Sequence, residues 1–318
     1  MYLHLGVDEN GLGPRLGPLV VTAVVARVGD IKAPARPRGA MSKRLGDSKK
    51  LVSHGDTALG EAWARAIAHR TGQLSSAEAV SAGPDGLVRS LSLDSAEALR
   101  APCPTDHRAQ CWDATGEAFV ADDALVALVS RDLERLAQKG IDVLRVVSVI
   151  ACARRLNEGI DRGLSRFHVD LHSMERLVVD ARERYGCDVI ATCGKVGGFD
   201  RYPGAFGPLN GRLHAVVTEG RARSEYAVPG VGRLAFVRDA DDKHLLVSMA
   251  SLVGKWARDL LMSRVVRYHR IANPDLPDAS GYHDPVTTRF IAATRLSRKK
   301  RALPDECFER RALDPAAT

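Results

Sequence analysis

Several features that would place this chain in a familiar class are missing from its sequence. The cysteines form no C-x-x-C pair and show no His/Cys spacing typical of a zinc site; they stand at positions 103, 111, 152, 187, 193 and 307. We therefore expect free thiols in a reducing compartment and no disulfide framework. No apolar run is long enough to cross a bilayer, and nothing resembles a targeting segment. The sequence thus predicts a cytoplasmic protein without a membrane partner.

The composition fits a globular chain with an uneven positive charge. Its 318 residues are 45% hydrophobic, and 46 Lys and Arg against 39 Asp and Glu give a net charge of +7. The excess gathers in RLSRKKR at 295–301 and in Arg310-Arg311. A basic surface favours phosphate-bearing partners because binding releases counterions. Basic tails also serve solubility, so charge by itself leaves both interpretations open.

Alternating apolar patterns predict an α/β domain with a mixed β-sheet flanked by helices. We expect one domain over 1–318, with an insertion at about 73–120, where Ser, Ala, Gly and Pro dominate, and a basic C-terminal segment at 285–318. The expected strands are 3–7 and 18–28 as a hairpin, 166–171, 187–194, and a strand pair from 211–220 and 233–240. The expected helices are 57–69, 122–138, 146–159, 243–272 and 286–296, with a further helix directly after residue 171.

An acidic pair, Asp8-Glu9, follows the first apolar run. Two carboxylates at the edge of a buried strand are costly unless a positive group, usually a divalent metal, neutralises them. The alternative is a surface acidic pair at a strand end. Adjacent residues point to opposite faces of an ideal strand. Both carboxylates can reach one site only if the strand ends or twists there, which the turn Gly11-Leu12-Gly13 would permit.

Two further acidic residues, Asp170 and Asp259, lie in mostly apolar surroundings. On the long predicted helix, Ser251, Lys255 and Asp259 are spaced i, i+4 and i+8, so they form a polar stripe beside the buried face. This stripe is either a structural ion pair or the wall of an active site. Phosphodiester hydrolysis by two hard cations about 4 Å apart needs several carboxylates from separate elements. The four acidic positions are candidates for such a set.

The segment DSKKL at 47–51 offers a hydroxyl group and two ammonium groups in a loop. Ser48 and Lys49 are suited to contact a phosphate. The alternative is a solvated lysine pair.

Taken in order, these motifs resemble those of type 2 ribonuclease H, the ribonuclease HII and HIII family. The matching segments are GVDENGLGPRLGPLVV, GDSKKL, a strand-borne Asp170, ASLVGKWARD and SGYHDP. They extend from residue 6 to about residue 290 and are interrupted by extra sequence at 73–160. The resemblance implies a ribonuclease H-like fold. It also implies hydrolysis of the RNA strand of RNA–DNA hybrids, or of ribonucleotides embedded in DNA.

The resemblance also implies roles for single residues. Metal-binding carboxylates would be Asp8, Glu9, Asp170 and Asp259, which would hold two Mg²⁺ or Mn²⁺ ions. Substrate contacts would come from Gly11, Leu12, Gly13, Ser48, Lys49, Lys243, Lys255 and Tyr282, and Asp241 and Ser251 fall in step with the same pattern. The aromatic ring at position 282 would stack on the sugar beside an RNA–DNA junction, a contact that reads sugar type and not base identity.

The chain departs from the family pattern at three positions. Leu12 stands where the HII branch has Arg and the HIII branch has Lys or Thr, so a phosphate-contacting side chain is missing from the turn. Asn10 replaces a small residue, and Leu171 follows Asp170 where the family generally has Gly. Two other functions therefore stay open: a metal-dependent nuclease of the same fold with another nucleic-acid substrate, and a nucleic-acid-binding protein with weak or no catalysis.

Overall fold

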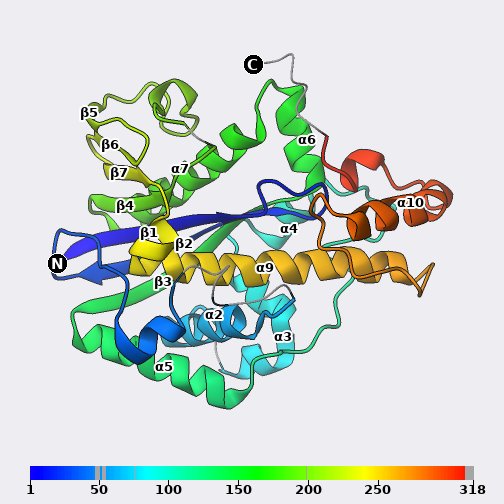
Figure 1. Cartoon of the computed structure of the whole chain (residues 1–318), viewed down its shortest axis with the longest axis horizontal. Helices are drawn as coiled ribbons and strands as arrows, with labels where there is room; N and C mark the ends of the chain where they lie inside the picture. Colours follow the sequence, from blue (N-terminus) through cyan, green and yellow to red (C-terminus); the bar gives the residue numbers. More distant parts are fainter. Residues whose placement is uncertain (47–50, 52–54, 75, 198, 312–318) are drawn as a thin grey trace.

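The computed structural model describes residues 1–46, 51, 55–74, 76–197 and 199–311 (Figure 1). A seven-stranded sheet in the order β3-β2-β1-β4-β7-β6-β5 forms its centre. The strands are β1 (Tyr2–Asn10), β2 (Leu19–Val28), β3 (Ile141–Ala151), β4 (Val189–Gly194), β5 (Ala215–Thr218), β6 (Arg223–Val228) and β7 (Gly232–Val237). The first three strands are antiparallel, β4 is parallel to β1, and β7 is parallel to β4. The predicted mixed sheet and its N-terminal hairpin are confirmed.

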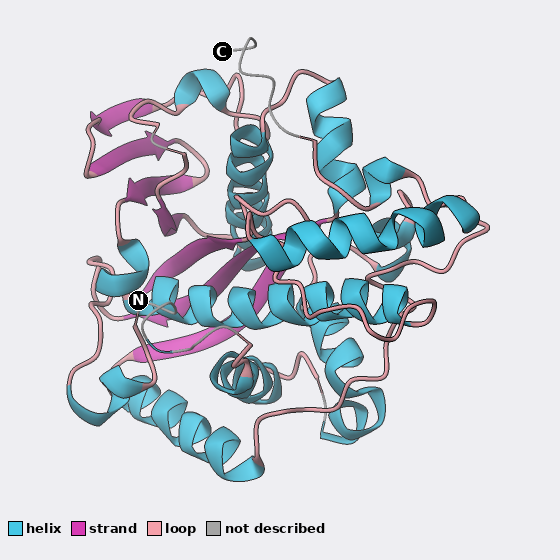
Figure 2. Cartoon of the chain, turned by 45° about the vertical axis from the view of Figure 1, so that its right-hand side comes forward, coloured by secondary structure: helices cyan, strands magenta, loops and turns pink. Residues whose placement is uncertain are grey.

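Helices cover both faces of this sheet, as Figures 1 and 2 show. The long helix α9 (Leu245–Arg270) lies on one face with α2 (Ala58–Arg70) and α5 (Asp123–Gln138), and α7 (Arg166–Tyr185) lies on the other. Side chains of β2 alternate between the two cores: Val20 and Val24 belong to the core of α2 and α9, whereas Val21 and Val25 belong to the core of α7. Because both faces are covered, β2 is apolar at nearly every position.

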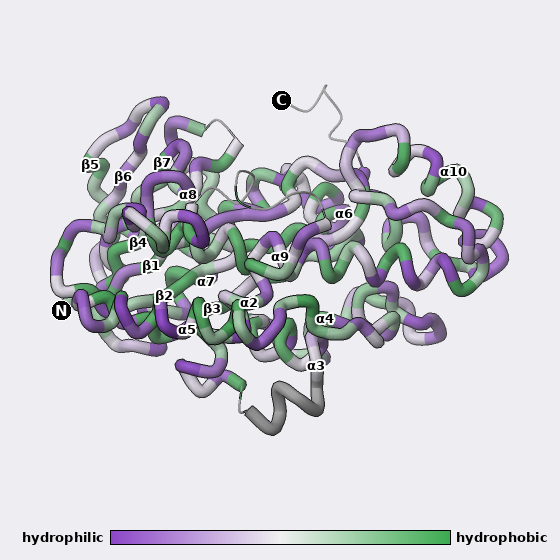
Figure 3. Tube along the Cα trace, turned by 60° about the horizontal axis from the view of Figure 1, so that its bottom comes forward, coloured by the Kyte–Doolittle hydropathy of each residue, from purple (hydrophilic) through white to green (hydrophobic). Residues whose placement is uncertain are grey.

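The remaining elements lie around this framework. They are η1 (Gly39–Lys43), α3 (Ser76–Leu91), α4 (Ala96–Arg100), α6 (Ala153–Asp161), η2 (Pro203–Ala205), α8 (Ala240–Lys243), α10 (Pro285–Lys300) and η3 (Asp305–Cys307). Hydrophobic and hydrophilic residues alternate along α10 (Figure 3), where Phe290 is buried while Arg295 and Lys299 are exposed. All six cysteines are free thiols, as predicted. Within the described ranges, no helix is long and apolar enough to span a membrane.

Three predicted elements are wrong. Residues 166–171 are not a strand but the first turns of α7, whose start is fixed by a capping box between Ser165 and His168. The predicted helix at 146–159 is instead the end of β3 followed by α6, because the β-branched run before residue 151 is buried on both faces of the sheet. The two strands expected to pair, β5 and β7, are separated by β6.

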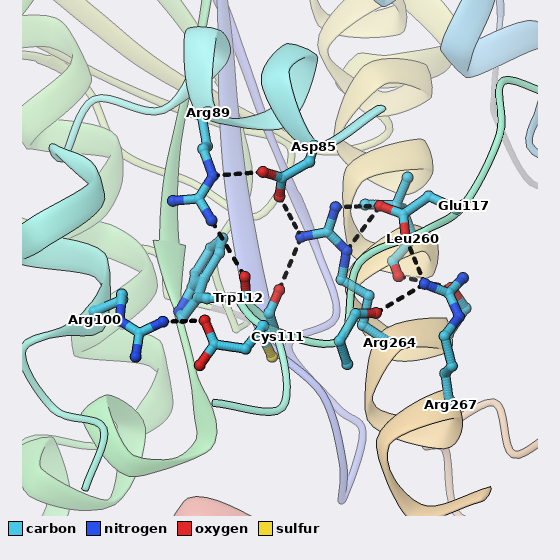
Figure 4. A network of polar contacts seen from close by, with 12 residues as sticks. Asp85, Arg89, Arg100, Cys111, Trp112, Glu117, Leu260, Arg264 and Arg267 are labelled. Atoms are coloured by element: carbon cyan, nitrogen blue, oxygen red, sulfur yellow. Dashed lines mark hydrogen bonds and ion pairs between the residues drawn. The ribbon is translucent and has the colours of Figure 1, made fainter. Parts of the chain in front are cut away.

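The region at 73–120, predicted to be an insertion, packs into the same core as α2 and α9. Leu87, Leu91, Leu99 and Trp112 are buried in that core. A network of polar contacts joins the region to α9 (Figure 4). At its centre, the fully buried Arg264 donates hydrogen bonds to Asp85 (2.8 Å), Glu117 (2.9 Å from Nε) and the carbonyl of Cys111 (2.9 Å).

A buried carboxyl group ties the segment after β4 to α7. Glu175 is fully buried, and its Oε2 accepts hydrogen bonds from the backbone N–H groups of Gly207 (3.1 Å) and Leu209 (2.8 Å). Burial raises the pKa of Glu175 to about 7, although these two hydrogen bonds oppose the shift.

We expect Glu175 to make the protein less stable as the pH rises from about 4.5 to about 7. Its pKa in the folded state lies above the ordinary value of 4.5, so the folded chain binds more protons than the unfolded chain in this window. The free energy of unfolding therefore falls through the window, and the loss is complete above pH 7. Urea unfolding at several pH values should show a flatter profile for Glu175→Gln than for the wild type. The matched change Glu158→Gln, at an exposed residue of α6, should keep the wild-type profile. Equal slopes for the wild type and Glu175→Gln would contradict this expectation.

Candidate active site

The acidic pair lies at the sheet edge where three neighbouring strands end. Asp8 and Glu9 are near the end of β1, and the parallel strands β4 and β7 end beside them at Gly194 and Val237. A cavity of about 240 Å³ opens here; it is lined by Asp8, Glu9, Asn10, Gly194, Lys195, Val237, Arg238, Asp239, Ala240, Asp241 and Ser251. The position matches the general tendency of ligands to bind at the carboxyl ends of parallel strands.

Both carboxylates of the pair approach the backbone of Gly194. A Cβ atom placed on this glycine would lie 3.0 Å from Oδ1 of Asp8 and 3.6 Å from Oε2 of Glu9. The two side chains therefore meet at one place although β1 continues to Asn10. Glycine at position 194 leaves the space between them and β4 open.

The start of α9 is brought to this edge by a close helix–strand contact. A Cβ atom on Gly6 of β1 would lie only 2.3 Å from the backbone carbon of Leu246, so no larger residue fits there. The contact places Ser251 of α9 beside the acidic pair, and its carbonyl accepts a hydrogen bond from Nδ2 of Asn10 (3.3 Å).

Asp170 lies beneath the same edge, on α7. It is fully buried, and neither of its carboxylate oxygens has a hydrogen-bond partner among the residues that the structure describes. Burial, and then the negative charge of Asp8, raise the pKa of Asp170 well above its ordinary value. A buried carboxyl group of this kind needs either a proton or a cation. Its position near Asp8, where both residues offer carboxylate oxygens, fits a hard divalent cation.

Asp259 is placed differently from the other three carboxylates. It accepts from Lys255 (3.1 Å) and from Arg258 (3.0 Å), so the ion pair predicted as one alternative is present. It lines a separate cavity of about 430 Å³ and follows Ser251 by eight residues, or about 12 Å along the helix axis. Within the described part of the chain, no group of three or more His, Cys, Asp or Glu residues is arranged to hold a metal ion.

The turn after the acidic pair packs against Arg258. Gly11 has a φ of 89°, and a Cβ atom there would lie 2.9 Å from the carbonyl oxygen of Pro18, so both its backbone and its surroundings require glycine. The guanidinium of Arg258 lies 4.8 Å from the centre of the Tyr282 ring and donates to the carbonyl of Ser280 (2.7 Å). Arg258 thus joins three predicted site residues, Gly11, Asp259 and Tyr282.

The other predicted substrate contacts are spread around these two places. Lys243, on α8, lies 3.6 Å from Asp239 and donates to the carbonyl of Arg238 (3.0 Å), at the rim of the acidic cavity. Leu12 is half-buried and Gly13 is exposed. Ser48 and Lys49 lie outside the described residues.

Two basic residues near the acidic pair are not among the site residues predicted from sequence. Lys195 is held by Asp200 (2.6 Å) and by the carbonyls of Gly220 and Arg221. Its place directly after a predicted strand was an available signal. Arg310, which contacts the Gly11 turn, was predicted only as part of the basic C-terminal excess, because the sequence does not show which segment its side chain meets.

No family model matches the sequence, and no curated protein matches it. Solved structures that are similar to this chain include the following two. A chain of the PCNA:RNase HII complex from Archaeoglobus fulgidus is 15% identical, with a TM-score of 0.41, and the match covers 99% of this chain and 100% of that chain. The ribonuclease H2 from Pyrococcus horikoshii OT3 is 14% identical, with a TM-score of 0.39, and the match covers 96% of this chain and 92% of that chain.

Proposed function

We propose that this protein is a divalent-metal-dependent endoribonuclease that cleaves the RNA strand of RNA–DNA hybrids or ribonucleotides embedded in DNA. The observation that supports it most is the meeting of Asp8 and Glu9 at Gly194, with Asp170 buried near Asp8 and lacking a hydrogen-bond partner among the described residues. A protein that only binds nucleic acid gains nothing from carboxylates facing a phosphate backbone. Negative groups gathered at a strand edge are what a bound cation requires.

Within this proposal, the chain's own residues have distinct tasks. Asp8 and Glu9, with Asp170 and Asp259 as the further members predicted from sequence, would hold the metal ions. Bound there, Mg²⁺ or Mn²⁺ would activate water and stabilise the leaving oxygen.

The residues proposed to contact the substrate lie around Arg258 and α8. The exposed ring of Tyr282 packs against the guanidinium of Arg258 and offers a surface on which a sugar can stack. Lys243 at the cavity rim would contact a phosphate, and Ser48, Lys49 and Lys255 remain proposed contacts from the sequence resemblance.

A second candidate is a nucleic-acid-binding protein with weak catalysis. The ion pairs of Asp259 with Lys255 and Arg258 favour it, because they neutralise one of the four carboxylates.

A cleavage assay on three duplexes separates these functions. The substrates are an RNA–DNA hybrid, a DNA duplex with one ribonucleotide, and plain DNA, each with Mg²⁺, with Mn²⁺ and with a chelator. We expect metal-dependent cleavage of one or both ribonucleotide-containing substrates, and none with the chelator. Metal-dependent cleavage of plain DNA would contradict the ribonuclease assignment. Binding without cleavage of any duplex would favour the second candidate.

A further inference from the structure

The loop at 11–17, which follows the acidic pair, is held between two distant segments of the chain. On one side the backbone N–H groups of Arg15 and Leu16 donate to the carbonyl of Gly281, at 2.7 and 3.1 Å. On the other side the N–H of Arg310 donates to the carbonyl of Arg15 (2.9 Å), and the Arg15 guanidinium pairs with Glu309 (2.7 Å). Residues from near the C-terminus therefore border the candidate active site.

The side chain of Arg310 reaches into this loop and binds its backbone. Arg310 is 3% exposed. Its Nε and Nη2 donate to the carbonyl of Gly17 (2.9 and 2.7 Å), and its Nη1 donates to the carbonyls of Gly11 (2.5 Å) and Leu12 (3.4 Å). The planar guanidinium suits this role because its donors fan out in a fixed geometry. Three carbonyl groups of one loop therefore accept hydrogen bonds from the guanidinium of Arg310.

This arrangement fixes where the neighbouring amide groups point. In a trans peptide the N–H of one residue points opposite to the carbonyl of the residue before it. The carbonyls of Gly11 and Leu12 point to Arg310, so the N–H groups of Leu12 and Gly13 point away from it. Neither N–H donates to a backbone carbonyl among the residues that the structure describes. A Cβ atom on Gly13 would meet no atom within 4 Å, so the space beside the turn is open.

Several arginine side chains lie around the loop. Burial lowers the pKa of Arg310 to about 9, and the charges of Arg166 and Arg258 act in the same direction. Arg166 also donates to the loop, at the carbonyl of Pro14 (3.4 Å). Two adjacent outward amides beside these arginines suit an anionic ligand such as a nucleic-acid backbone.

We propose that Arg310 is a positioning residue: it orients the turn Gly11-Leu12-Gly13 so that its amide groups face the nucleic-acid strand beside Asp8 and Glu9. This inference rests on the proposed nuclease function. It adds a task for the C-terminal segment at a turn to which Leu12 brings no basic side chain.

Two variants of the full-length protein test the proposal, Arg310→Met and Arg310→Lys. Methionine keeps a long apolar side chain without the charge, and lysine keeps the charge without the planar guanidinium group and its several donors. Arg270→Met is the matched control, because Arg270 also donates twice to a backbone carbonyl, that of Leu276, outside the candidate site. Hydrogen exchange of the amides of Arg15 and Leu16, measured without nucleic acid, reports the order of the loop. Steady-state cleavage of the preferred duplex reports kcat and KM separately.

We expect faster exchange at residues 15 and 16 and a fall in kcat of about 10²-fold for Arg310→Met, since a misplaced contact of this kind costs about that factor. Arg310→Lys should fall between Arg310→Met and the wild type, and Arg270→Met should match the wild type in both measurements. Unchanged exchange in Arg310→Met would overturn the proposal. Faster exchange with wild-type kcat would also overturn it, because Arg310 would then serve the fold alone. If the wild-type protein cleaves no duplex, the proposed function fails, while the exchange data still decide whether Arg310 holds the loop.

Discussion

Changing Asp8 to asparagine is expected to abolish cleavage while leaving nucleic-acid binding intact or tighter. Asp8 is nearly buried, lies within reach of Gly194 together with Glu9, and acts electrostatically on Asp170. Asparagine keeps the shape of the side chain but removes the negative charge that would hold a cation. Loss of metal-assisted catalysis costs several kcal/mol, which corresponds to a fall in rate of about 10³-fold or more. Removing a negative charge that faces the phosphates should not weaken binding.

The control for this experiment is Asp188→Asn. Asp188 is an exposed residue before β4 that lies 3.5 Å from Arg182, so its change should leave cleavage and binding at wild-type levels. Binding is measured by titration of a labelled duplex, and cleavage by single-turnover assay of the same duplex. Wild-type cleavage by Asp8→Asn would remove the acidic pair from the proposed mechanism.

Changing Arg264 to methionine is expected to destabilise the folded chain by about 3–5 kcal/mol, the usual loss when one partner of a buried ion pair is removed. Arg264 is fully buried, and Glu117 depends on it, since this arginine contributes most to lowering the pKa of Glu117 against the effect of burial. Without the guanidinium, Glu117 and Asp85 lose a shared partner, and the carbonyl of Cys111 loses a donor. Urea unfolding followed by circular dichroism measures the free energy of unfolding.

Arg267→Met is the matched control for this change. Arg267 lies on the same helix and also pairs with Glu117 (2.6 Å), but its side chain is 37% exposed. Exposed ion pairs contribute about 1 kcal/mol or less. The two variants should therefore differ clearly in stability. A loss of less than about 1 kcal/mol in Arg264→Met would show that the contacts in Figure 4 do not join residues 85–117 firmly to α9.

The elements predicted correctly are those with a strong local pattern. The N-terminal hairpin follows from two apolar runs separated by glycines and proline, and α9 from a long helical repeat. The start of α7 was misread because RFHVDL alternates over too few residues to separate a strand from a helix. Its helical state is decided by the cap at Ser165, whose side chain accepts a hydrogen bond from the N–H of His168.

The candidate site also combines features predicted from local sequence with features that only the packing of distant segments creates. A metal site near Asp8 and Glu9 was predicted from residue type and from position after a buried strand. The structure adds Gly194 of β4, which lies beside both carboxylates, and it places the predicted Asp170 on α7 near Asp8. The spacing of Lys255 and Asp259 allowed both an ion pair and an active-site wall, so the sequence did not decide between them. The structure shows the ion pair.

The sequence by itself determined the α/β class, the hairpin, the free thiols and the acidic residues that carry the proposed chemistry. These follow from local periodicity and residue chemistry, which act over a few neighbouring positions. Only the tertiary structure decided that Asp170 lies near Asp8 and that Arg310 binds a loop almost 300 residues before it. Contacts between distant segments depend on how the packed layers bring them together, and no local pattern encodes that geometry.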